Sequence, residues 1–300
     1  MAKEDHLLEL ELRGFRGFDH VHLKKFRDVN VIVGENNAGK TSLLEAIAMG
    51  ANTMGSRNLV LKSLRLPASD SVQNWLINDG AEDKAFHIEI KTQRGAFGMS
   101  RGSEEDYENY ADRVELKVAI ISSHVGAQPD LIKNFGEAVR SRKGEDLIHK
   151  ILQQLDQRIS RVRVDPLPSG NIITLDIGLS ESIPLSQAGQ GIYRVVAILS
   201  KLVGEKPDIC LIDEIENGLH HTVHKKVWEG LAKISKELEI QLFVSTHSDE
   251  CLEAAFEVFD ATEEDDFAVI QCMRIGDRIE SRVLGEKEIK AAFRNELELR

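Results

Sequence analysis

Long apolar runs, paired cysteines and a basic excess are all missing from this sequence of 300 residues. No stretch approaches the roughly 18 consecutive apolar residues of a membrane-spanning helix, so we expect no membrane span. Residues 1–6 lack the apolar core of a secretory signal peptide, which predicts a cytoplasmic protein without a membrane partner. The three cysteines form no C-x-x-C pair, so neither a zinc site nor a disulfide framework is indicated, and we expect buried thiols.

The charge balance also limits the function, because the formal net charge is −12 at pH 7. Binding to nucleic acid in general needs a basic surface, so this charge argues against broad affinity for DNA or RNA. Lysine and arginine are nevertheless clustered at 140–143 and 158–163. Such clusters are usually a solvated charged face, but they leave a local contact with nucleic acid open.

Apolar residues make up 42% of the chain, which is enough for a real core in one large α/β domain or two small ones. The second half alternates apolar strands with helices, as a largely parallel sheet does. We expect its strands at 208–212 and 240–245, its helices at 188–202, 220–237 and 248–259, and a hairpin at 268–274 and 279–284. The first half alternates polar and apolar residues, as half-buried strands do. We expect these strands at 8–12, 21–23, 85–91 and 114–118, with a surface loop over 94–112.

The most informative stretch is GENNAGKTS at 34–42, which matches the phosphate-binding pattern G-x-x-x-x-G-K-[ST] without a mismatch. An apolar strand at 29–33 precedes it, and a helix-forming segment follows it. This order aims successive backbone N–H groups and a helix N-terminus at a polyphosphate. The residues expected to bind the nucleotide are Gly34, Asn36, Asn37, Ala38, Gly39, Lys40, Thr41 and Ser42.

The residue types of this loop suit a nucleoside triphosphate with Mg²⁺. Gly34 and Gly39 let the backbone bend around oxygen atoms where a Cβ would clash. Lys40 supplies a positive charge for the β- and γ-phosphates, and the Thr41 hydroxyl is a hard oxygen ligand for Mg²⁺.

Two later strands end in groups suited to hydrolysis. The strand at 208–212 is followed by Asp213, which is placed to hold Mg²⁺ with Thr41. Glu214 comes next and is the natural general base for a water that attacks the γ-phosphate. The strand at 240–245 is followed by His247, which we expect to contact the γ-phosphate or the attacking water. The predicted catalytic residues are Lys40, Glu214 and His247.

A run rich in serine and glycine, LSQAGQG at 185–191, leads into the helix expected at 188–202. The Ser186 hydroxyl, the glycines Gly189 and Gly191 and the helix N-terminus suit a γ-phosphate that approaches from outside. Such runs are also ordinary turns, so the interpretation depends on the position of this one ahead of the carboxylate strand.

In this order the four segments resemble the motifs of the ATP-binding-cassette (ABC) class of ATPase. Walker A corresponds to 34–41, the signature to 185–191, Walker B to 209–214 and the H-loop to His247. Within that class, LELRGFRGF at 10–18 and DEIENGLH at 213–220 resemble the RecF, SMC and OLD (overcoming lysogenisation defect) ATPases. The transporter ATPases of the class lack the second of these runs. The resemblance covers essentially the whole chain.

The resemblance implies an α/β fold, namely a P-loop NTPase with an ABC-type ATPase head. Such a head has a mostly parallel core sheet, an N-terminal antiparallel β lobe and a helical insertion. We expect one domain over 1–300, with an N-terminal lobe to about 122, a helical arm over about 123–165 and a C-terminal lobe from about 166.

The resemblance also implies a mechanism in which two heads face each other and sandwich two ATP molecules. Ser186 and Gly189 of one copy would complete the site of the other, so the chain would form a homodimer when it binds ATP. The preference for ATP over GTP rests on the resemblance.

The chain departs from two members of this group. Residues 51–184 contain no sustained heptads, so the long coiled coil of SMC proteins is not expected. Too few residues follow His247 for the nuclease domain of OLD proteins. These departures favour an ATPase switch for a separate protein effector, for example a nuclease in phage defence. The alternative is a DNA repair or DNA-end-binding ATPase of RecF type. A third possible function, the ATPase subunit of a transporter, conflicts with the run DEIENGLH at 213–220. A P-loop kinase is a fourth, but a kinase would need neither the signature run nor His247.

Overall fold

The computed structural model describes residues 4–51, 77, 85–101, 116–123, 128–168, 170–261 and 265–294. Its strands are β1 (Glu9–Phe15), β2 (Phe18–Lys24), β3 (Val29–Val33), β4 (Phe86–Thr92), β5 (Gly95–Arg101), β6 (Val118–Ile121), β7 (Arg161–Leu167), β8 (Gly170–Asp176), β9 (Ile183–Pro184), β10 (Ile209–Ile212), β11 (Gln241–Ser245), β12 (Phe267–Ile275) and β13 (Arg278–Leu284). Its helices are α1 (Lys40–Ala51), α3 (Gln128–Val139), α4 (Arg142–Leu155), α5 (Gln190–Glu205), α6 (His224–Leu238), α7 (Asp249–Asp260) and α8 (Glu286–Arg294), with 3-10 turns η2 (Leu185–Gln187) and η3 (His221–Val223). None of the helices in these ranges has the length and apolar character needed to cross a bilayer.

The central sheet has the strand order β13-β12-β3-β11-β10-β6. The strands from β12 to β6 run parallel to their neighbours, and β13 is an antiparallel edge. Every residue of β3, β10 and β11 is buried, which explains why these strands are mostly apolar in sequence. The mostly parallel core sheet expected from the resemblance is confirmed.

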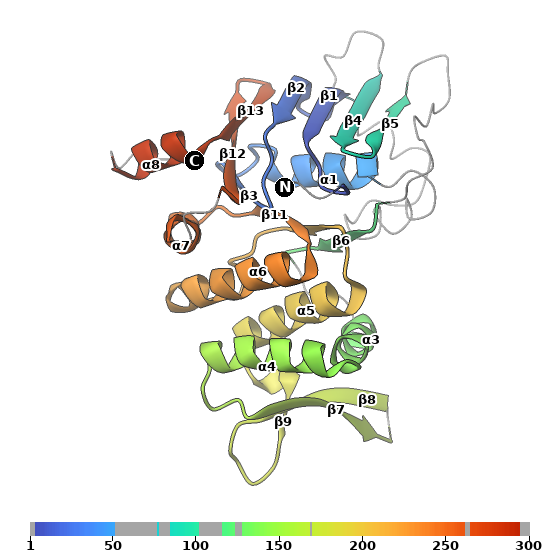
Figure 1. Ribbon diagram of the computed structural model, residues 1–300, viewed down its shortest axis with the longest axis vertical. Coiled ribbons are helices and arrows are strands. Elements are labelled where there is room, and N and C mark those ends of the chain that lie inside the picture. Colours follow the sequence, from blue (N-terminus) through green and yellow to red (C-terminus); the bar gives the residue numbers. More distant parts are fainter. Residues whose placement is uncertain are drawn as a thin grey trace.

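This sheet separates two hydrophobic cores, because side chains alternate between the faces of a strand. On one face, Ile32, Leu211 and Phe243 pack with α1 and the antiparallel sheet β2-β1-β4-β5, which confirms the N-terminal β lobe. On the other face, Val31 and Val244 pack with residues of α3 to α7. Figure 1 shows the β lobe at the top of the molecule and the helices α3 to α6 below the central sheet. The three cysteines are free and buried, as expected.

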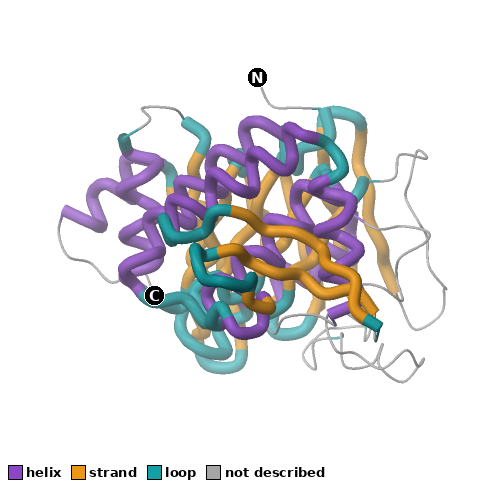
Figure 2. The backbone as a smooth tube through the Cα atoms, turned by 90° about the horizontal axis from the view of Figure 1, so that it is seen from below, coloured by secondary structure: helices purple, strands orange, loops and turns teal. Residues whose placement is uncertain are grey.

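The segment expected to form a helical arm instead packs into the core that contains Val31 and Val244. Phe135 of α3 is fully buried, as are Ile148 and Ile151 of α4. A Cβ at Gly144 would collide with the carbonyl oxygen of Ala138, so glycine allows α4 to begin close against the end of α3. In Figure 1 these helices lie beside α5 and α6, and Figure 2 shows the β7–β8 hairpin crossing them on the underside. The resemblance predicted a helical segment here, but not that it packs inward.

Two predictions for the first half of the chain were wrong, one for a loop and one for the position of a strand. Residues Gly95–Arg101 form β5 rather than a loop, paired with β4; residues 102–112 of the expected loop lie outside the described ranges. The glycines that suggest a loop have a steric role here, since a Cβ at Gly98 would collide with the Ile88 carbonyl. The strand expected at 114–118 is β6, which begins at Val118, where pairing with Ile209 of β10 begins.

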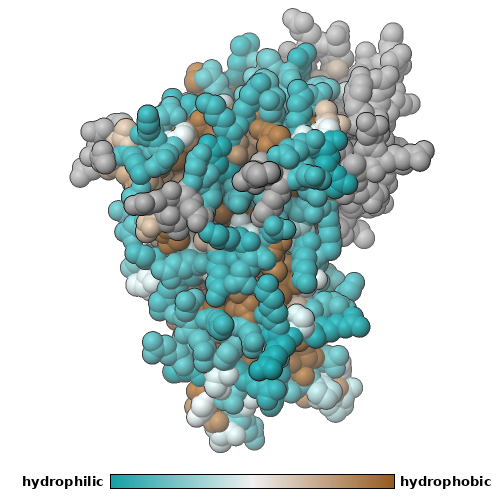
Figure 3. Space-filling view, viewed as in Figure 1, coloured by the Kyte–Doolittle hydropathy of each residue, from teal (hydrophilic) through white to brown (hydrophobic). Residues whose placement is uncertain are grey.

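The exterior is rich in charge. On the face shown in Figure 3, hydrophilic residues cover most of the surface and hydrophobic residues show as small areas between them. Exposed ion pairs such as Lys225–Glu257, whose charged atoms are 2.9 Å apart, are typical of this surface. Such pairs contribute little to stability, so the two cores carry most of it.

We predict that Phe135→Ala lowers the free energy of unfolding by about 3–5 kcal/mol, because it leaves a cavity between α3 and α5. Lys133→Ala, on the exposed side of the same helix, should change it by less than about 0.5 kcal/mol. Urea unfolding followed by circular dichroism measures both. Equal, small effects would mean that α3 projects as an arm after all.

Candidate active site

The phosphate loop joins β3 to α1 at the carboxyl edge of the central sheet. Gly34 has φ +150°, and a Cβ there would collide with the carbonyl oxygen of Cys272 on β12. Gly39 has φ +92°, and its carbonyl accepts the N–H of Leu43 at 2.9 Å, which starts the helix. Both positions therefore exclude a side chain, as the sequence pattern requires. Asn36 and Asn37 are exposed at the tip of the loop and Ala38 is buried beneath it. Ser42 lies half-buried in the first turn of α1.

Lys40 lies over this loop and is only 7% exposed. Its Nζ donates to the carbonyl oxygens of Gly34 at 2.8 Å and Glu35 at 2.9 Å. Burial lowers the pKa of Lys40, and the nearby carboxylates of Glu216, Glu214 and Asp213 act in the opposite direction. A buried ammonium held by neutral carbonyls gains strongly from a phosphate oxygen, so the loop suits a polyphosphate.

Thr41 and Asp213 form a pair of hard oxygen ligands. The Thr41 hydroxyl lies 3.2 Å from Oδ1 and 3.4 Å from Oδ2 of Asp213. Within the described ranges, no group of three or more His, Cys, Asp or Glu side chains is arranged to hold a metal ion. An ion here would take the remaining ligands from phosphate and water, which is how Mg²⁺ binds with nucleotides. The residues present therefore fit Mg²⁺.

Ser245 is a site residue that the sequence analysis missed. Its hydroxyl donates to Oδ1 of Asp213 at 2.7 Å and accepts the backbone N–H of Glu214 at 2.9 Å. Glu214 has φ +48°, a strained backbone conformation for a residue other than glycine, and the Ser245 bond helps to hold it. The Asn217 amide donates to Oε2 of Glu214 at 2.6 Å. Ser245 ends β11 beside the carboxylate strand, and that parallel register is the signal that could have found it.

His247 follows at the same edge of the sheet, because Thr246 donates its N–H to Ile32 of β3 at 3.0 Å. The His247 ring is 43% exposed, and its Nδ1 lies 2.8 Å from Oε1 of Glu216. The structure thus brings the phosphate loop, Asp213, Glu214 and, through Glu216, His247 to one place. The sequence analysis did not single out Glu216, because nothing in the motif identifies its partner.

The signature run lies against the turn after β10 rather than on its own phosphate loop. Ser186 and Gly189 are exposed at the start of α5, and a Cβ at Gly191 would lie 3.0 Å from the carbonyl oxygen of Gly218. In the part of the chain that is described, the Ser186 side chain makes no hydrogen bond to the phosphate loop. Ser186 is an exposed residue, so another molecule can reach it.

Arg194, one turn further along α5, is a second residue missed from the sequence. It is 2% exposed and donates to the carbonyl oxygens of Ser122 and, at 2.9 Å, of Asp213. Burial lowers the pKa of Arg194, while the nearby charges of Asp213 and Glu214 raise it. This guanidinium connects the signature helix to the end of the carboxylate strand. The sequence alone could not predict this contact, because an arginine among the apolar residues of a helix does not indicate its partner.

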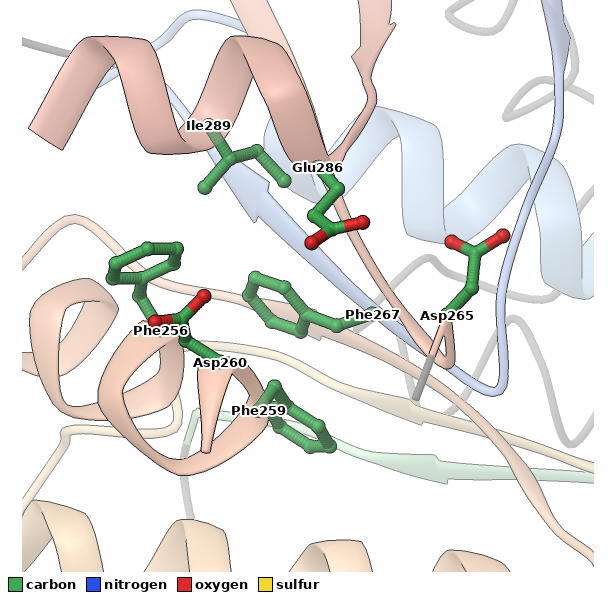
Figure 4. A pocket seen from close by; sticks show the side chains of 7 residues that line it. All are labelled: Phe256, Phe259, Asp260, Asp265, Phe267, Glu286 and Ile289. Atoms are coloured by element: carbon green, nitrogen blue, oxygen red, sulfur yellow. The ribbon is translucent and has the colours of Figure 1, made fainter. Parts of the chain in front are cut away.

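A separate small cavity between α7 and α8 does not compete as a nucleotide site. It has a volume of about 30 Å³, and Figure 4 shows Phe256, Phe259 and Phe267 with three carboxylates around it. Lys290 binds two of these carboxylates, those of Asp260 and Glu286, and Arg27 binds the third, Asp265. The cavity is the size of about one water molecule, and its charges are already paired.

We predict that Ser245→Ala raises the Mg²⁺ concentration needed for half-maximal nucleotide hydrolysis about 10-fold, because Asp213 loses the donor that orients it. The matched control is Ser235→Ala, which removes another buried serine hydroxyl at the opposite end of β11, where it bonds to Ile240. Both variants should lose about 1 kcal/mol of stability, but only the first should change the Mg²⁺ requirement. Equal Mg²⁺ requirements would contradict the role assigned to Ser245.

Comparison with known proteins agrees with this geometry. A family model described as an AAA domain matches residues 9–181, which is more than half of the chain. The ATP/GTP phosphatase of Helicobacter pylori is 22% identical, over 86% of this chain and 89% of that protein. The DNA replication and repair protein RecF of Xanthomonas euvesicatoria is 32% identical, but over only 31% of this chain and 22% of that protein.

Solved structures with the same fold are heads of SMC proteins. An SMC head bound to the C-winged helix domain of ScpA superposes with a TM-score of 0.67, at 16% identity, over 95% of this chain and 99% of that one. The SMC head domain of Thermotoga maritima superposes with a TM-score of 0.56, at 16% identity, over 93% of this chain and 98% of that one. With its intact phosphate loop and carboxylate strand, the chain belongs to the AAA domain family and is an ABC-class ATPase of the RecF/SMC group.

Proposed function

We propose that the chain binds ATP with Mg²⁺, dimerises around two nucleotides and acts as a nucleotide switch for a separate protein effector. The observation that carries the proposal is the approach of Thr41 to Asp213, at 3.2 Å, next to a complete phosphate loop. A phosphate loop alone binds phosphate, whereas this pair adds a place for the metal and positions Glu214 beside it.

Each of these residues has its own role in the reaction ATP + water → ADP + phosphate. The backbone N–H groups of the loop and Lys40 bind the β- and γ-phosphates. Thr41 and Asp213 hold Mg²⁺, which, when bound, neutralises charge on the phosphoryl oxygens. Glu214 accepts a proton from the water that attacks the γ-phosphate, and His247 contacts that phosphate or the water. The similarity to a protein named as an ATP/GTP phosphatase supports this reaction.

The exposed signature supports dimerisation. Ser186 and Gly189 lie at the surface, where a second copy can reach them, and Gly191 close by packs against Gly218 of the turn 213–220. Gly189 has φ +88° and precedes α5 without a side-chain cap, so the first N–H groups of this helix are available to an anion. A γ-phosphate bound to a second copy is such an anion, and ATP would then join the two heads.

A protein effector is supported by the fold. One of the similar SMC heads was solved with the winged-helix domain of ScpA, so a head of this architecture can carry a protein partner. The OLD-like motifs make a nuclease in phage defence one setting for such a switch. The acidic net charge of −12 also favours a protein partner over general nucleic-acid binding.

We predict that Glu214→Gln changes from a monomer of 33.6 kDa to a dimer of twice that mass only when ATP and Mg²⁺ are both present. The substitution removes the general base, so bound ATP should persist and hold the two heads together. Light scattering coupled to size exclusion measures the mass.

The control is Glu214→Gln combined with Ser186→Arg, which places a bulky cation on the exposed signature surface while leaving the phosphate loop intact. It should still bind ATP but remain a monomer. A mass of Glu214→Gln that does not respond to nucleotide would contradict ATP-driven dimerisation, and the assignment of Ser186 would be withdrawn first.

The second candidate function is direct action on nucleic acid, and one observation favours it. Arg140 on the α3–α4 connection, Arg142 at the start of α4 and Arg161 on β7 line a single groove of about 540 Å³. The two basic clusters of the sequence thus come together. Glu145 and Asp146 line the same groove and reduce its positive potential, so this candidate ranks second.

If nucleic acid binds there, Arg142→Glu with Arg161→Glu should weaken ATP-dependent binding of duplex DNA and lower the slope of log K against log salt by at least about 2. The control is Arg158→Glu, because Arg158 pairs with Asp156 and does not line the groove. Fluorescence anisotropy across a salt series measures both. Equal binding by the double variant and the control would reject the groove as the DNA site.

A further inference from the structure

A buried carboxylate, Glu216, lies next to the proposed catalytic residues and has no role in the chemistry described above. It belongs to the turn after β10 and is 9% exposed. Its Oε1 accepts the backbone N–H of His247 at 2.7 Å and lies 2.8 Å from Nδ1 of the same residue. One oxygen atom therefore holds both the main chain and the ring of His247.

This contact determines which ring nitrogen carries the proton. An ionised carboxylate oxygen can only accept hydrogen bonds, so Nδ1 of His247 must be the donor. In the neutral ring, Nε2 is then left with a free lone pair on the opposite side from Glu216. Since the His247 ring is 43% exposed, Nε2 is the nitrogen available to a ligand.

Four helices carry titratable groups that interact electrostatically with Glu216. Its negative charge acts on Lys40 of α1, Arg194 of α5, His224 of α6 and Cys251 of α7, the elements that pack around it. Burial lowers the pKa of His224, so this ring is neutral near pH 7, even though Glu216 and Glu250 act in the opposite direction. The compensating charges are thus Lys40 and Arg194, with the two N–H groups of His247 as direct donors.

A second observation points to the same role. The other oxygen of Glu216, Oε2, is buried and has no hydrogen-bond partner in the described part of the chain. A buried acceptor without a partner costs free energy, so a native structure retains one where another requirement outweighs that cost. Among the described residues, the side chain of Glu216 hydrogen-bonds only to His247.

From this geometry we infer that Glu216 is a positioning residue that fixes His247 in the Nδ1–H tautomer and leaves Nε2 to meet the γ-phosphate or the attacking water. The inference rests on the proposed function, in which His247 has that contact. A carboxylate behind a histidine sets the tautomer and stabilises the imidazolium that forms when Nε2 takes a proton. The protonated ring then donates a charge-assisted hydrogen bond to a phosphate oxygen.

The first test needs neither nucleotide nor activity. In protein labelled with ¹⁵N at histidine, long-range ¹⁵N–¹H spectra above neutral pH distinguish the two tautomers, and His247→Gln assigns the signal. We expect wild-type His247 as Nδ1–H. We also expect the population of this tautomer to fall in Glu216→Gln, whose side chain keeps one acceptor oxygen. The population should fall further in Glu216→Met, whose side chain has a similar length but no acceptor oxygen. An Nε2–H ring in the wild type overturns the inference, whether or not the variants fold.

The second test is kinetic. Glu216→Met should lower kcat for ATP hydrolysis about 10- to 100-fold while KM changes less than about 3-fold, because the effect lies in orientation rather than in nucleotide binding. Glu216→Gln should recover part of the loss. The matched control is Glu250→Gln, an exposed acid on α7 that bonds to Ser248, acts on the charge of His224 and does not contact His247.

A double variant shows whether Glu216 works through His247. Glu216→Met with His247→Ala should cost no more than His247→Ala alone. If the two losses multiply, Glu216 acts through another neighbour such as Lys40 and the inference is wrong. A wild type that shows the Nδ1–H ring but hydrolyses no ATP contradicts the proposed function and supports the orienting role of Glu216. Active protein with an Nε2–H ring contradicts that orienting role alone.

Discussion

The parallel pairing of β3, β11 and β10 is the constraint on which the rest of the site depends. Ile32 of β3 pairs with Ser245 of β11, and Val244 of β11 pairs with Ile212 of β10. Because the three strands end at the same edge, the phosphate loop, Ser245 and Asp213 meet there although they are far apart in sequence. A shift of one residue in either pairing would turn these side chains to the opposite face. The buried apolar runs of all three strands prevent such a shift.

Residues of the turn after β10 contact the phosphate loop, His247 and the start of the signature helix. Asp213 approaches Thr41 of the phosphate loop, Glu214 is held by Asn217, and Glu216 holds His247. Gly218 packs against Gln190 at the start of the signature helix. Neighbouring positions in one turn thus contact different motifs. A displacement of the signature helix by a second molecule would reach Glu214 through a few covalently linked residues.

Energetically costly features are concentrated in this turn and in the helix α5 beside it. Glu214 adopts a left-handed backbone conformation, Glu216 leaves a buried oxygen without a partner, and Arg194 is buried with its charge compensated mainly by carbonyl oxygens and nearby carboxylates. Features of this kind cost about 1–3 kcal/mol each and persist only where the surrounding structure enforces them. The two cores on either side of the central sheet supply that support. The placement of these costly features beside the phosphate loop agrees with a site in which precise positioning of side chains outweighs maximal stability.

The sequence by itself determined what depends on local pattern: the phosphate loop, the Asp213–Glu214 pair at the end of a strand, the alternation of strands and helices in the second half and the mostly parallel sheet. These features follow from residue type and spacing within a short stretch. Only the tertiary structure decided the partners. Ser245, Glu216 and Arg194 have their contacts because of strand register and helix packing. Residues 95–101 form β5 because they pair with the edge of β4. The helices α3 and α4 pack inward because Gly144 lets them approach each other closely. Such contacts join residues far apart in the chain, and a single sequence carries no local signal for them.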